Sequence, residues 1–396
     1  MPGISNEYIN GVVNNIVSEN NLKECQFSQL NFESIAQNYF GVLIPLVLNG
    51  KKNNEAVSLH IVLKLAPTDE QYRVSGALTQ FFSREIFAYS IILKKYNILQ
   101  KGFPIELQYL IPQCYYVCKE YCNEAIAMQN MSVNGYKPYT NKRYLDFDHV
   151  TVSLKSLAKF HALSFIMKER DRELYEKSLK VCLPLSAANN KRFMDILQDR
   201  LDKALIKLEN TKYVPMLETL KQNLNDNIES ASNNVQRICI CHGDIWKENI
   251  LYKYEDNRPI SACLIDYQTV RTISPAYDAL YLIISSTNSE LRHQHYGELL
   301  TVYYEMFATV LKEAGLNPDF LYSKDMFYSD LKTVGPACFI VANTALWLSN
   351  GLQKEGHVRS KTPWNTKEEE IDAVNSYKLA IVGIIEDFIK YGYLYL

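Results

Sequence analysis

Several features that would assign this chain to a common functional class are missing from its sequence. Its net charge is only −2 at pH 7 over 396 residues. No basic block stands out, which argues against nucleic acid as the main partner. No acidic run is present that would obviously collect a polycationic ligand. Residues 42–48, the longest apolar run near the start, contain Pro45 and are too short to span a bilayer. We therefore expect no membrane partner.

Signals for secretion and for disulfide bonding are missing too. Residues 1–10 have neither the basic region nor the apolar region of a secretory signal. The nine cysteines are odd in number and irregularly spaced, which fits free thiols in the cytosol better than a disulfide framework. We therefore expect a cytoplasmic protein. Cys239, Cys241 and His242 suggest a metal site, but Cys239 lies in an apolar run and no second ligand pair follows, which disfavours zinc.

The chain also lacks internal repeats and low-complexity linkers. With 47% hydrophobic residues it can bury an ordinary core, and its length suits two or three domains or one large bilobal domain. Tyrosine is common, at 28 residues. Tyrosine can cover a flat, partly polar ligand, but it also fills ordinary cores, and the count alone does not choose between these roles.

The most informative stretch runs over residues 241–268, CHGDIWKENILYKYEDNRPISACLIDYQ. A polar turn carries Asp244, and Asn249 follows five residues later. Two β-like runs, 250–254 and 262–265, come next, joined by a turn at 255–259. The second run delivers Asp266. We therefore expect a hairpin that brings Asp244, Asn249 and Asp266 within a few ångströms of one another.

This set of oxygen-bearing side chains suits phosphoryl transfer. A carboxylate, Asp244, would orient the attacking hydroxyl and take its proton. Asn249 and Asp266 would hold Mg²⁺ on the nucleotide phosphates. Protein kinases use the same arrangement of Asp, Asn and a later Asp. The alternative is a surface turn with ordinary polar residues, which the spacing between two strands disfavours.

The chain carries three motifs in order, HGDxWxxN, IDYQ and SPAYD. Together they resemble the ecdysteroid kinase-like family, a branch of the choline kinase and aminoglycoside phosphotransferase superfamily. The resemblance covers about residues 30 to 350. Choline kinases usually carry a different residue before the catalytic Asp, and aminoglycoside phosphotransferases usually carry His where Trp246 stands. The matching residues are His242, Gly243, Asp244, Trp246 and Asn249 in the loop, Asp266 and Gln268 in the metal motif, and Pro275 and Asp278 at the next helix start.

The resemblance gives Lys64 and Glu85 a role in nucleotide binding. Alternation over 56–65 predicts a strand that ends near Lys64, and helical spacing over 79–96 surrounds Glu85. In a kinase-like fold this pair positions the lysine on the α- and β-phosphates. The alternative for Lys64 is a solvated strand end.

Three positions depart from the family pattern. Ala36 replaces the usual Gly in a turn that would lie over the phosphates with Asn38 and Tyr39, which can restrict the approach of backbone amides. Gln129 and Asn130 replace both acids of the family's Leu-Glu-Asp-Leu segment, the expected hinge where backbone groups of Gln129 and Met131 would meet adenine.

Apolar residues at helical spacing predict the remaining helices, at 5–19, 147–168, 289–315, 326–352 and 367–391. His161 lies on an apolar helix face, which favours a structural role. Asp278, at the start of a helix, is expected to accept backbone hydrogen bonds from the catalytic loop. Trp347 and Trp364 can line an acceptor site or fill the core, and the sequence does not choose.

We therefore predict an α+β, bilobal, protein-kinase-like fold, with a small β-rich lobe at 1–131 and a larger helical lobe at 132–396. It would bind ATP and Mg²⁺ and phosphorylate a small-molecule alcohol, with ecdysteroids as one substrate class that the resemblance implies. A ligand-binding pseudokinase is the alternative, based on Ala36, Gln129 and Asn130. A protein kinase is disfavoured because no Ala-Pro-Glu motif follows Asp266. The oligomeric state is left open.

Overall fold

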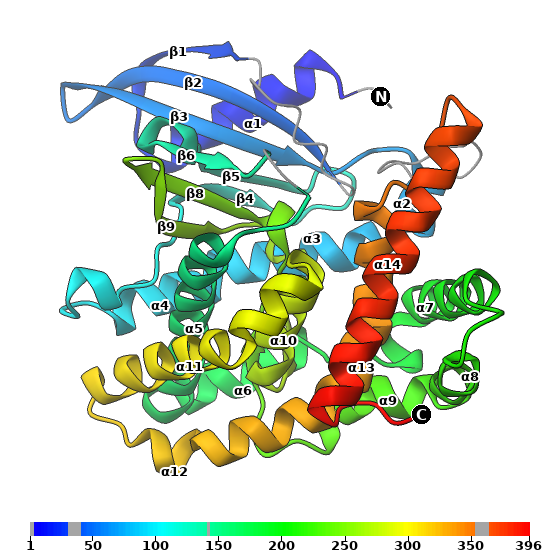
Figure 1. Cartoon of the computed structure of the whole chain (residues 1–396). Helices are drawn as coiled ribbons and strands as arrows, with labels where there is room; N and C mark the ends of the chain where they lie inside the picture. Colours follow the sequence, from blue (N-terminus) through cyan, green and yellow to red (C-terminus); the bar gives the residue numbers. More distant parts are fainter. Residues whose placement is uncertain (1–3, 31–40, 141–142, 353–363) are drawn as a thin grey trace. The chain divides into compact units, whose positions relative to one another are not determined.

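The computed structural model describes residues 4–30, 41–140, 143–352 and 364–396 (Figure 1). The chain forms two compact units. The sheet unit comprises Met1–Asn97, Leu110–Lys137 and Asp266–Thr269. The helical unit comprises Ile98–Tyr109, Pro138–Ile265 and Val270–Leu396. This antiparallel sheet region and helical region confirm the predicted α+β class.

The sheet unit is built on five antiparallel strands in the order β1-β2-β3-β5-β4. Strands β2 and β3 join through Asn53 and Asn54, which have φ values of 52° and 67°. Asn tolerates this left-handed conformation, and a two-residue turn of this kind matches the twist of the strands. The strands are β1 (Lys23–Gln29), β2 (Val42–Lys52), β3 (Glu55–Leu65), β4 (Cys114–Cys118) and β5 (Ala125–Gln129).

Helix α1 (Asn6–Glu19) covers one face of this sheet (Figure 1). Ser5 caps it, accepting a hydrogen bond from the backbone N–H of Tyr8 at 3.1 Å. Its apolar face packs into the core that Leu46, Ile61 and Leu63 form on the sheet. This burial stabilises a helix that would be marginal in isolation.

The helix predicted at 79–96 is divided by a π-helical turn. It consists of α3 (Leu78–Phe87), the π-turn η1 (Ala88–Ile92) and α4 (Leu93–Leu99). Such turns are frequent at functional sites. The shorter elements nearby are α2 (Glu70–Gly76), η2 (Ile105–Leu107), η3 (Met131–Asn134) and β6 (Tyr136–Pro138).

The helical unit is arranged around α5 (Phe147–Arg170), which packs against α11 (Ser289–Glu313) and strand β9 (Arg258–Leu264) (Figure 1). Helix α10 (Pro275–Ser286) packs against α13 (Lys324–Ser349) and α5. The other helices are α6 (Arg172–Val181), α7 (Ala187–Lys207), α8 (Val214–Gln222), α9 (Leu224–Asn233), α12 (Pro318–Tyr322) and α14 (Lys367–Tyr391).

The hairpin of β8 (Ile250–Glu255) and β9 forms as predicted, but its turn is shorter than the predicted 255–259. Asp256 and Asn257 make the turn, with φ values of 47° and 61°. Pro259 therefore lies in β9, where the register shifts opposite Tyr254. A proline is tolerated in a strand at such an irregularity.

Two further strands of the helical unit, β7 (Cys239–Cys241) and β10 (Arg271–Ile273), pair antiparallel. One stretch, Pro318–Ser349, is long and apolar enough to cross a membrane by length and composition, but 72% of its most apolar window is buried inside the protein. Core helices pass the same test, so this is weak evidence for a span.

Candidate active site

The His-Gly-Asp loop (residues 242–249) connects β7 to β8 in the helical unit. Gly243 has a φ of 84°, a conformation that glycine adopts without strain. The Asn249 side-chain amide donates to the carbonyl of Asp244 at 2.8 Å, and the Asn249 carbonyl accepts from the N–H of Ile265 at 3.0 Å. The two ends of the loop are thereby fixed to each other and to the end of the hairpin.

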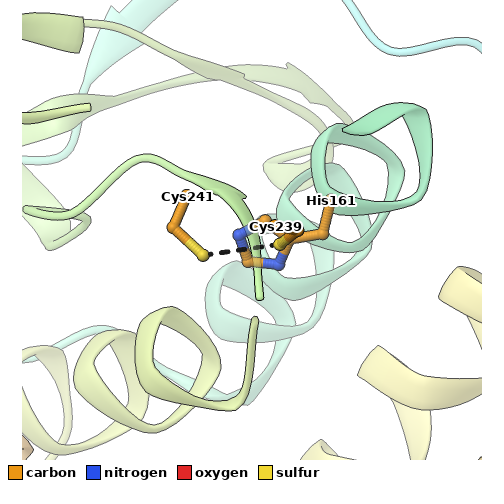
Figure 2. Close-up of side chains that lie close together, drawn as sticks. All are labelled: His161, Cys239 and Cys241. Carbon is orange, nitrogen blue, oxygen red and sulfur yellow. Dashed lines mark hydrogen bonds between the residues drawn. The ribbon is translucent and has the colours of Figure 1, made fainter. Parts of the chain in front are cut away.

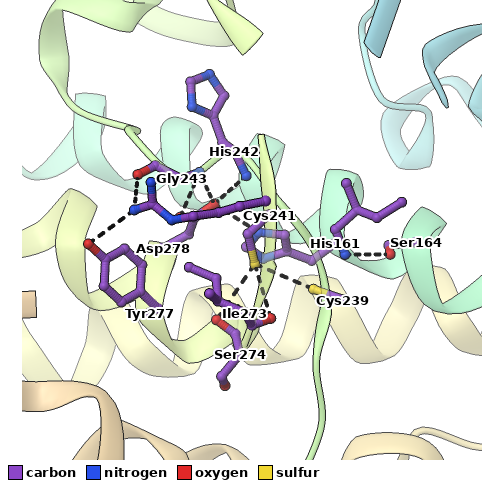
Figure 3. Close-up of polar contacts among 12 residues, drawn as sticks. His161, Ser164, Cys239, Cys241, His242, Gly243, Ile273, Ser274, Tyr277 and Asp278 are labelled. Atoms are coloured by element: carbon purple, nitrogen blue, oxygen red, sulfur yellow. Dashed lines mark hydrogen bonds and ion pairs between the residues drawn. The ribbon is translucent and has the colours of Figure 1, made fainter. Parts of the chain in front are cut away.

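Asp278, on α10, anchors the start of this loop (Figure 3). Its carboxylate accepts from the backbone N–H of His242 at 2.6 Å and of Gly243 at 3.1 Å, as the sequence predicts. His161 contacts the same carboxylate at 3.2 Å through Nε2 and the Tyr303 hydroxyl at 2.7 Å through Nδ1. Burial alone would raise the pKa of Asp278, but the neighbouring His161 outweighs it and lowers that pKa. His161 therefore has the predicted structural contacts.

A second residue of α10 holds the side chain of Asp244. The buried Tyr281 hydroxyl donates to Asp244 Oδ1 at 2.9 Å. Tyr281 and Asp278 are three residues apart and so share one face of the helix. The sequence alone assigns Tyr281 no role. The three-residue spacing from Asp278 places Tyr281 on the same helix face, but helical spacing does not say which residue the tyrosine hydroxyl contacts.

Lys64, on β3, is the centre of a charged cluster in the sheet unit. Its ammonium donates to Glu85 Oε2 on α3 at 2.6 Å and to Asp266 Oδ1 at 2.8 Å. A longer contact of 3.5 Å joins it to Gln268 Oε1. The Lys64 side chain is only 2% exposed. The predicted Lys64–Glu85 pair therefore forms, and the contacts with Asp266 and Gln268 are additional.

Burial and charge act against each other in this cluster. Burial opposes the charged form of Lys64, but Asp266 and Glu85 outweigh it and raise the pKa of the lysine. Burial also raises the pKa of Glu85, to about 7, although Lys64 opposes that shift. Asp266 has a φ of 69°, which is uncommon outside glycine and concentrates at functional sites.

The backbone at Gly41 passes close to the Lys64 side chain. Gly41, just before β2, approaches Lys64 so nearly that a Cβ there would lie 3.1 Å from Lys64 Cγ. Any larger residue would have to move the lysine stem. The preceding residues Ala36, Asn38 and Tyr39, expected to lie over the phosphates, fall outside the described residues.

The predicted hinge residues lie at the end of β5. The Gln129 N–H donates to the Gln113 carbonyl at 2.8 Å, and its side-chain oxygen accepts from the Gln113 N–H at 3.2 Å. The Asn130 side chain caps η3, accepting from the Ser132 N–H at 3.1 Å. Met131 is buried. The amides that replace the family's two acids therefore have local structural partners.

The predicted site residues fall in both units. Asp244 and Asn249 belong to the helical unit, whereas Lys64, Glu85, Gln129, Met131 and Asp266 belong to the sheet unit. Within each unit the contacts are those given above. The convergence of Asp244, Asn249 and Asp266, and their roles in catalysis and metal binding, remain predictions.

A lysine–glutamate pair on an antiparallel sheet unit, together with a helical unit that carries a His-Gly-Asp loop, defines a kinase-like protein. The chain belongs to the ecdysteroid kinase-like family, whose model matches residues 36–316. None of the curated proteins matches the chain in sequence.

Several solved structures are similar at low identity. The Plasmodium vivax ethanolamine kinase is 14% identical, with coverage of 97% of this chain and 87% of that chain and a TM-score of 0.44. The GDP complex of wild-type aminoglycoside 2'-phosphotransferase-IIIa is 13% identical, with coverage of 94% and 98% and a TM-score of 0.39. Choline kinase LicA from Streptococcus pneumoniae is 12% identical, with coverage of 96% and 99% and a TM-score of 0.36.

Proposed function

We propose that the protein is a small-molecule kinase that transfers the γ-phosphate of ATP to an alcohol hydroxyl. The observation that carries the proposal is the buried Lys64 ammonium, which lies between Glu85 at 2.6 Å and Asp266 at 2.8 Å. In kinases the strand lysine, held by a helix glutamate, contacts nucleotide phosphates, and the later Asp binds the metal. Family membership supports the same reaction class.

The charge of this cluster favours a bound cation. Above the raised pKa of Glu85, Lys64 supplies one positive charge against the two negative charges of Glu85 and Asp266. Mg²⁺ would offset this excess and would bring phosphate oxygens to Lys64. Asp266 and Asn249 offer the hard oxygen ligands that Mg²⁺ prefers. When bound, the ion supplies charge neutralisation between the β- and γ-phosphates.

Asp244 would act as the general base toward the acceptor hydroxyl. Its Oδ1 accepts the hydrogen bond of Tyr281, and its loop is held by Asp278 and by the Asn249 amide. A fixed carboxylate suits general-base catalysis, because it is already oriented toward the acceptor before the reaction begins. Gln129 and Met131 would meet adenine through backbone groups, and Asn38 and Tyr39 would lie near the phosphates.

The acceptor is proposed to be a bulky, neutral or weakly charged alcohol, with ecdysteroids as the first class to test. Family membership and the 28 tyrosines are the support. The reaction would take place in the cytoplasm, where the nine free cysteines stay reduced.

The test presents ATP, Mg²⁺ and equal concentrations of an ecdysteroid, choline, ethanolamine and an aminoglycoside to the purified full chain. Mass spectrometry follows the gain of one phosphate on each acceptor, and ADP release is measured in parallel. A metabolite extract serves as an unbiased fifth acceptor. The Asp244→Asn variant controls for contaminating kinases.

A phosphorylated alcohol that Asp244→Asn fails to produce supports the proposal. Preference for choline or the aminoglycoside by about tenfold in kcat/KM, or about 1.4 kcal/mol, would overturn the ecdysteroid assignment while keeping the kinase. Absence of any phosphorylated product, together with intact nucleotide binding, would favour the pseudokinase.

A further inference from the structure

His161, Cys239 and Cys241 form a cluster of metal-ligating side chains (Figure 2), and Cys241 directly precedes the His-Gly-Asp loop. The two thiols lie on β7 and point the same way, with their Sγ atoms 3.6 Å apart. His161 comes from α5, a distant segment of the chain, and supplies a further ligand that the sequence around Cys239 and Cys241 does not offer and for whose lack zinc is disfavoured there. One donor atom from each residue lies within 4.8 Å of the others. We call these residues the thiol–imidazole cluster.

We propose that the thiol–imidazole cluster binds a zinc ion that ties β7 to α5. The sulfur spacing carries much of the argument. Two sulfurs held tetrahedrally on zinc at about 2.3 Å lie about 3.8 Å apart. The observed spacing of 3.6 Å is close to this value. A small inward movement of His161 would complete three of the four positions.

The burial and the donor atoms of the cluster favour zinc over Mg²⁺ and Ca²⁺. The exposed fractions of Cys239, Cys241 and His161 are 1%, 0% and 0%, so an uncompensated charge there would be costly. Zn²⁺ with two thiolates and a neutral imidazole has no net charge of its own, and the nearby Asp278 carboxylate keeps the backbone N–H groups of His242 and Gly243 as hydrogen-bond donors. Mg²⁺ and Ca²⁺ prefer oxygen ligands, whereas thiolates favour soft ions such as zinc.

The surroundings of His161 match those of a metal-binding histidine. Such a histidine usually donates its second ring N–H to a carboxylate, which fixes the ring. Asp278 lies 3.2 Å from His161 Nε2 and is fully buried. With Nε2 on Asp278, Nδ1 is the nitrogen left for zinc, which would replace the present contact of Nδ1 with the Tyr303 hydroxyl at 2.7 Å. That hydroxyl would then supply an oxygen for the fourth position.

The ion would have a structural role close to the proposed active site. Cys241 directly precedes His242, whose backbone N–H is held by Asp278. Zinc bonded to Cys241 and His161 would therefore fix the strand from which the His-Gly-Asp loop departs. This role concerns folding and does not depend on which reaction the protein catalyses.

The experiment measures the zinc content of the full chain, produced in zinc-supplemented medium and passed through a chelator-containing column. Wild type is compared with the Cys239→Ala/Cys241→Ala double variant. Cys263→Ala is the matched control, since Cys263 is also a buried free thiol but lies outside the cluster. We expect about one zinc per chain in wild type and control, and a loss of about tenfold in the double variant.

A second measurement keeps the test decisive if the double variant does not fold. Wild-type protein produced with Co²⁺ in place of zinc should show a thiolate-to-cobalt absorption band and the visible bands of tetrahedral cobalt. Zinc below about one tenth per chain in wild type, zinc retained in the double variant, or cobalt bound without a thiolate band would each overturn the proposal.

Discussion

At the scale of single residues, the proposed base is fixed by contacts from one helix. Asp278 holds the backbone of His242 and Gly243, and Tyr281 holds the Asp244 carboxylate. The sequence predicts the first of these contacts because Asp278 belongs to a motif. It does not predict the second, because Tyr281 belongs to none of the motifs and only packing decides where its hydroxyl points.

Replacing Asp244 with Asn should preserve folding and cut turnover. The amide keeps the shape of the side chain but cannot accept the proton of the acceptor hydroxyl. Loss of a general base typically lowers kcat by about 10²–10⁴-fold. Steady-state kinetics on the acceptor found in the screen gives the ratio. Turnover near that of wild type would remove Asp244 from the role of base.

Tyr281→Phe should lower kcat with little change in KM for ATP, because it frees the carboxylate that Tyr281 holds at 2.9 Å. A hydrogen bond to a charged group is worth about 1.5–3 kcal/mol, so we expect a loss of about 10- to 100-fold. Tyr252→Phe is the control. It removes another buried hydroxyl, which bonds Ser153 at 2.9 Å. Equal losses in both variants would indicate general destabilisation instead of positioning.

At the scale of helices and strands, the apolar periodicity predicts most elements to within a few residues. Helices α11, α13 and α14 begin and end near the predicted 289–315, 326–352 and 367–391. The bounds of the turn before Pro259 are shorter than predicted, and the π-turn in the Glu85 helix is not predicted, since both depend on local backbone geometry. Close contacts between segments that lie far apart in the chain are also not predicted by the sequence.

One such contact gives a stability prediction. Gly335, buried in α13, lies against Tyr393, and a Cβ there would come within 2.7 Å of Tyr393 Cβ. Gly335→Ala should therefore destabilise the helical unit by about 1–3 kcal/mol through overpacking. Exposed Gly297 in α11 has no atom within 4 Å of such a Cβ and is the control. Gly297→Ala should stabilise by about 0.5–1 kcal/mol.

Chemical denaturation of the two glycine variants separates these effects. Opposite signs of the change in unfolding free energy are expected, with Gly335→Ala less stable and Gly297→Ala more stable than wild type. If Gly335→Ala is as stable as wild type, Tyr393 does not constrain α13 in solution.

At the scale of the whole molecule, the predicted site residues are shared between the two units. The sequence predicts the chemistry of each residue from its motif, and the Lys64–Glu85 and Asp278 contacts follow from it. It does not predict that Lys64 already contacts Asp266, because 202 residues separate them. Because of this contact, Mg²⁺ would have to share Asp266 with the lysine. The sharpest test of the proposed nucleotide site is therefore whether nucleotide binding depends on Mg²⁺.

The thermal stability of the full chain should rise by a few degrees with ATP and Mg²⁺ together, since a ligand that binds only the folded state stabilises it. The rise should weaken when a chelator replaces Mg²⁺, because Asp266 and Lys64 then meet the phosphates without the bridging ion. In Asp266→Ala the Mg²⁺-dependent part of the rise should vanish, while the part that nucleotide gives alone persists through Lys64 and Glu85. Asp195→Ala is the control, because that carboxylate is exposed and pairs with Lys191, one helical turn away, at 2.9 Å. Stabilisation of wild type that is equal with Mg²⁺ and with chelator would refute the metal assignment, and no stabilisation at about millimolar nucleotide would refute nucleotide binding itself.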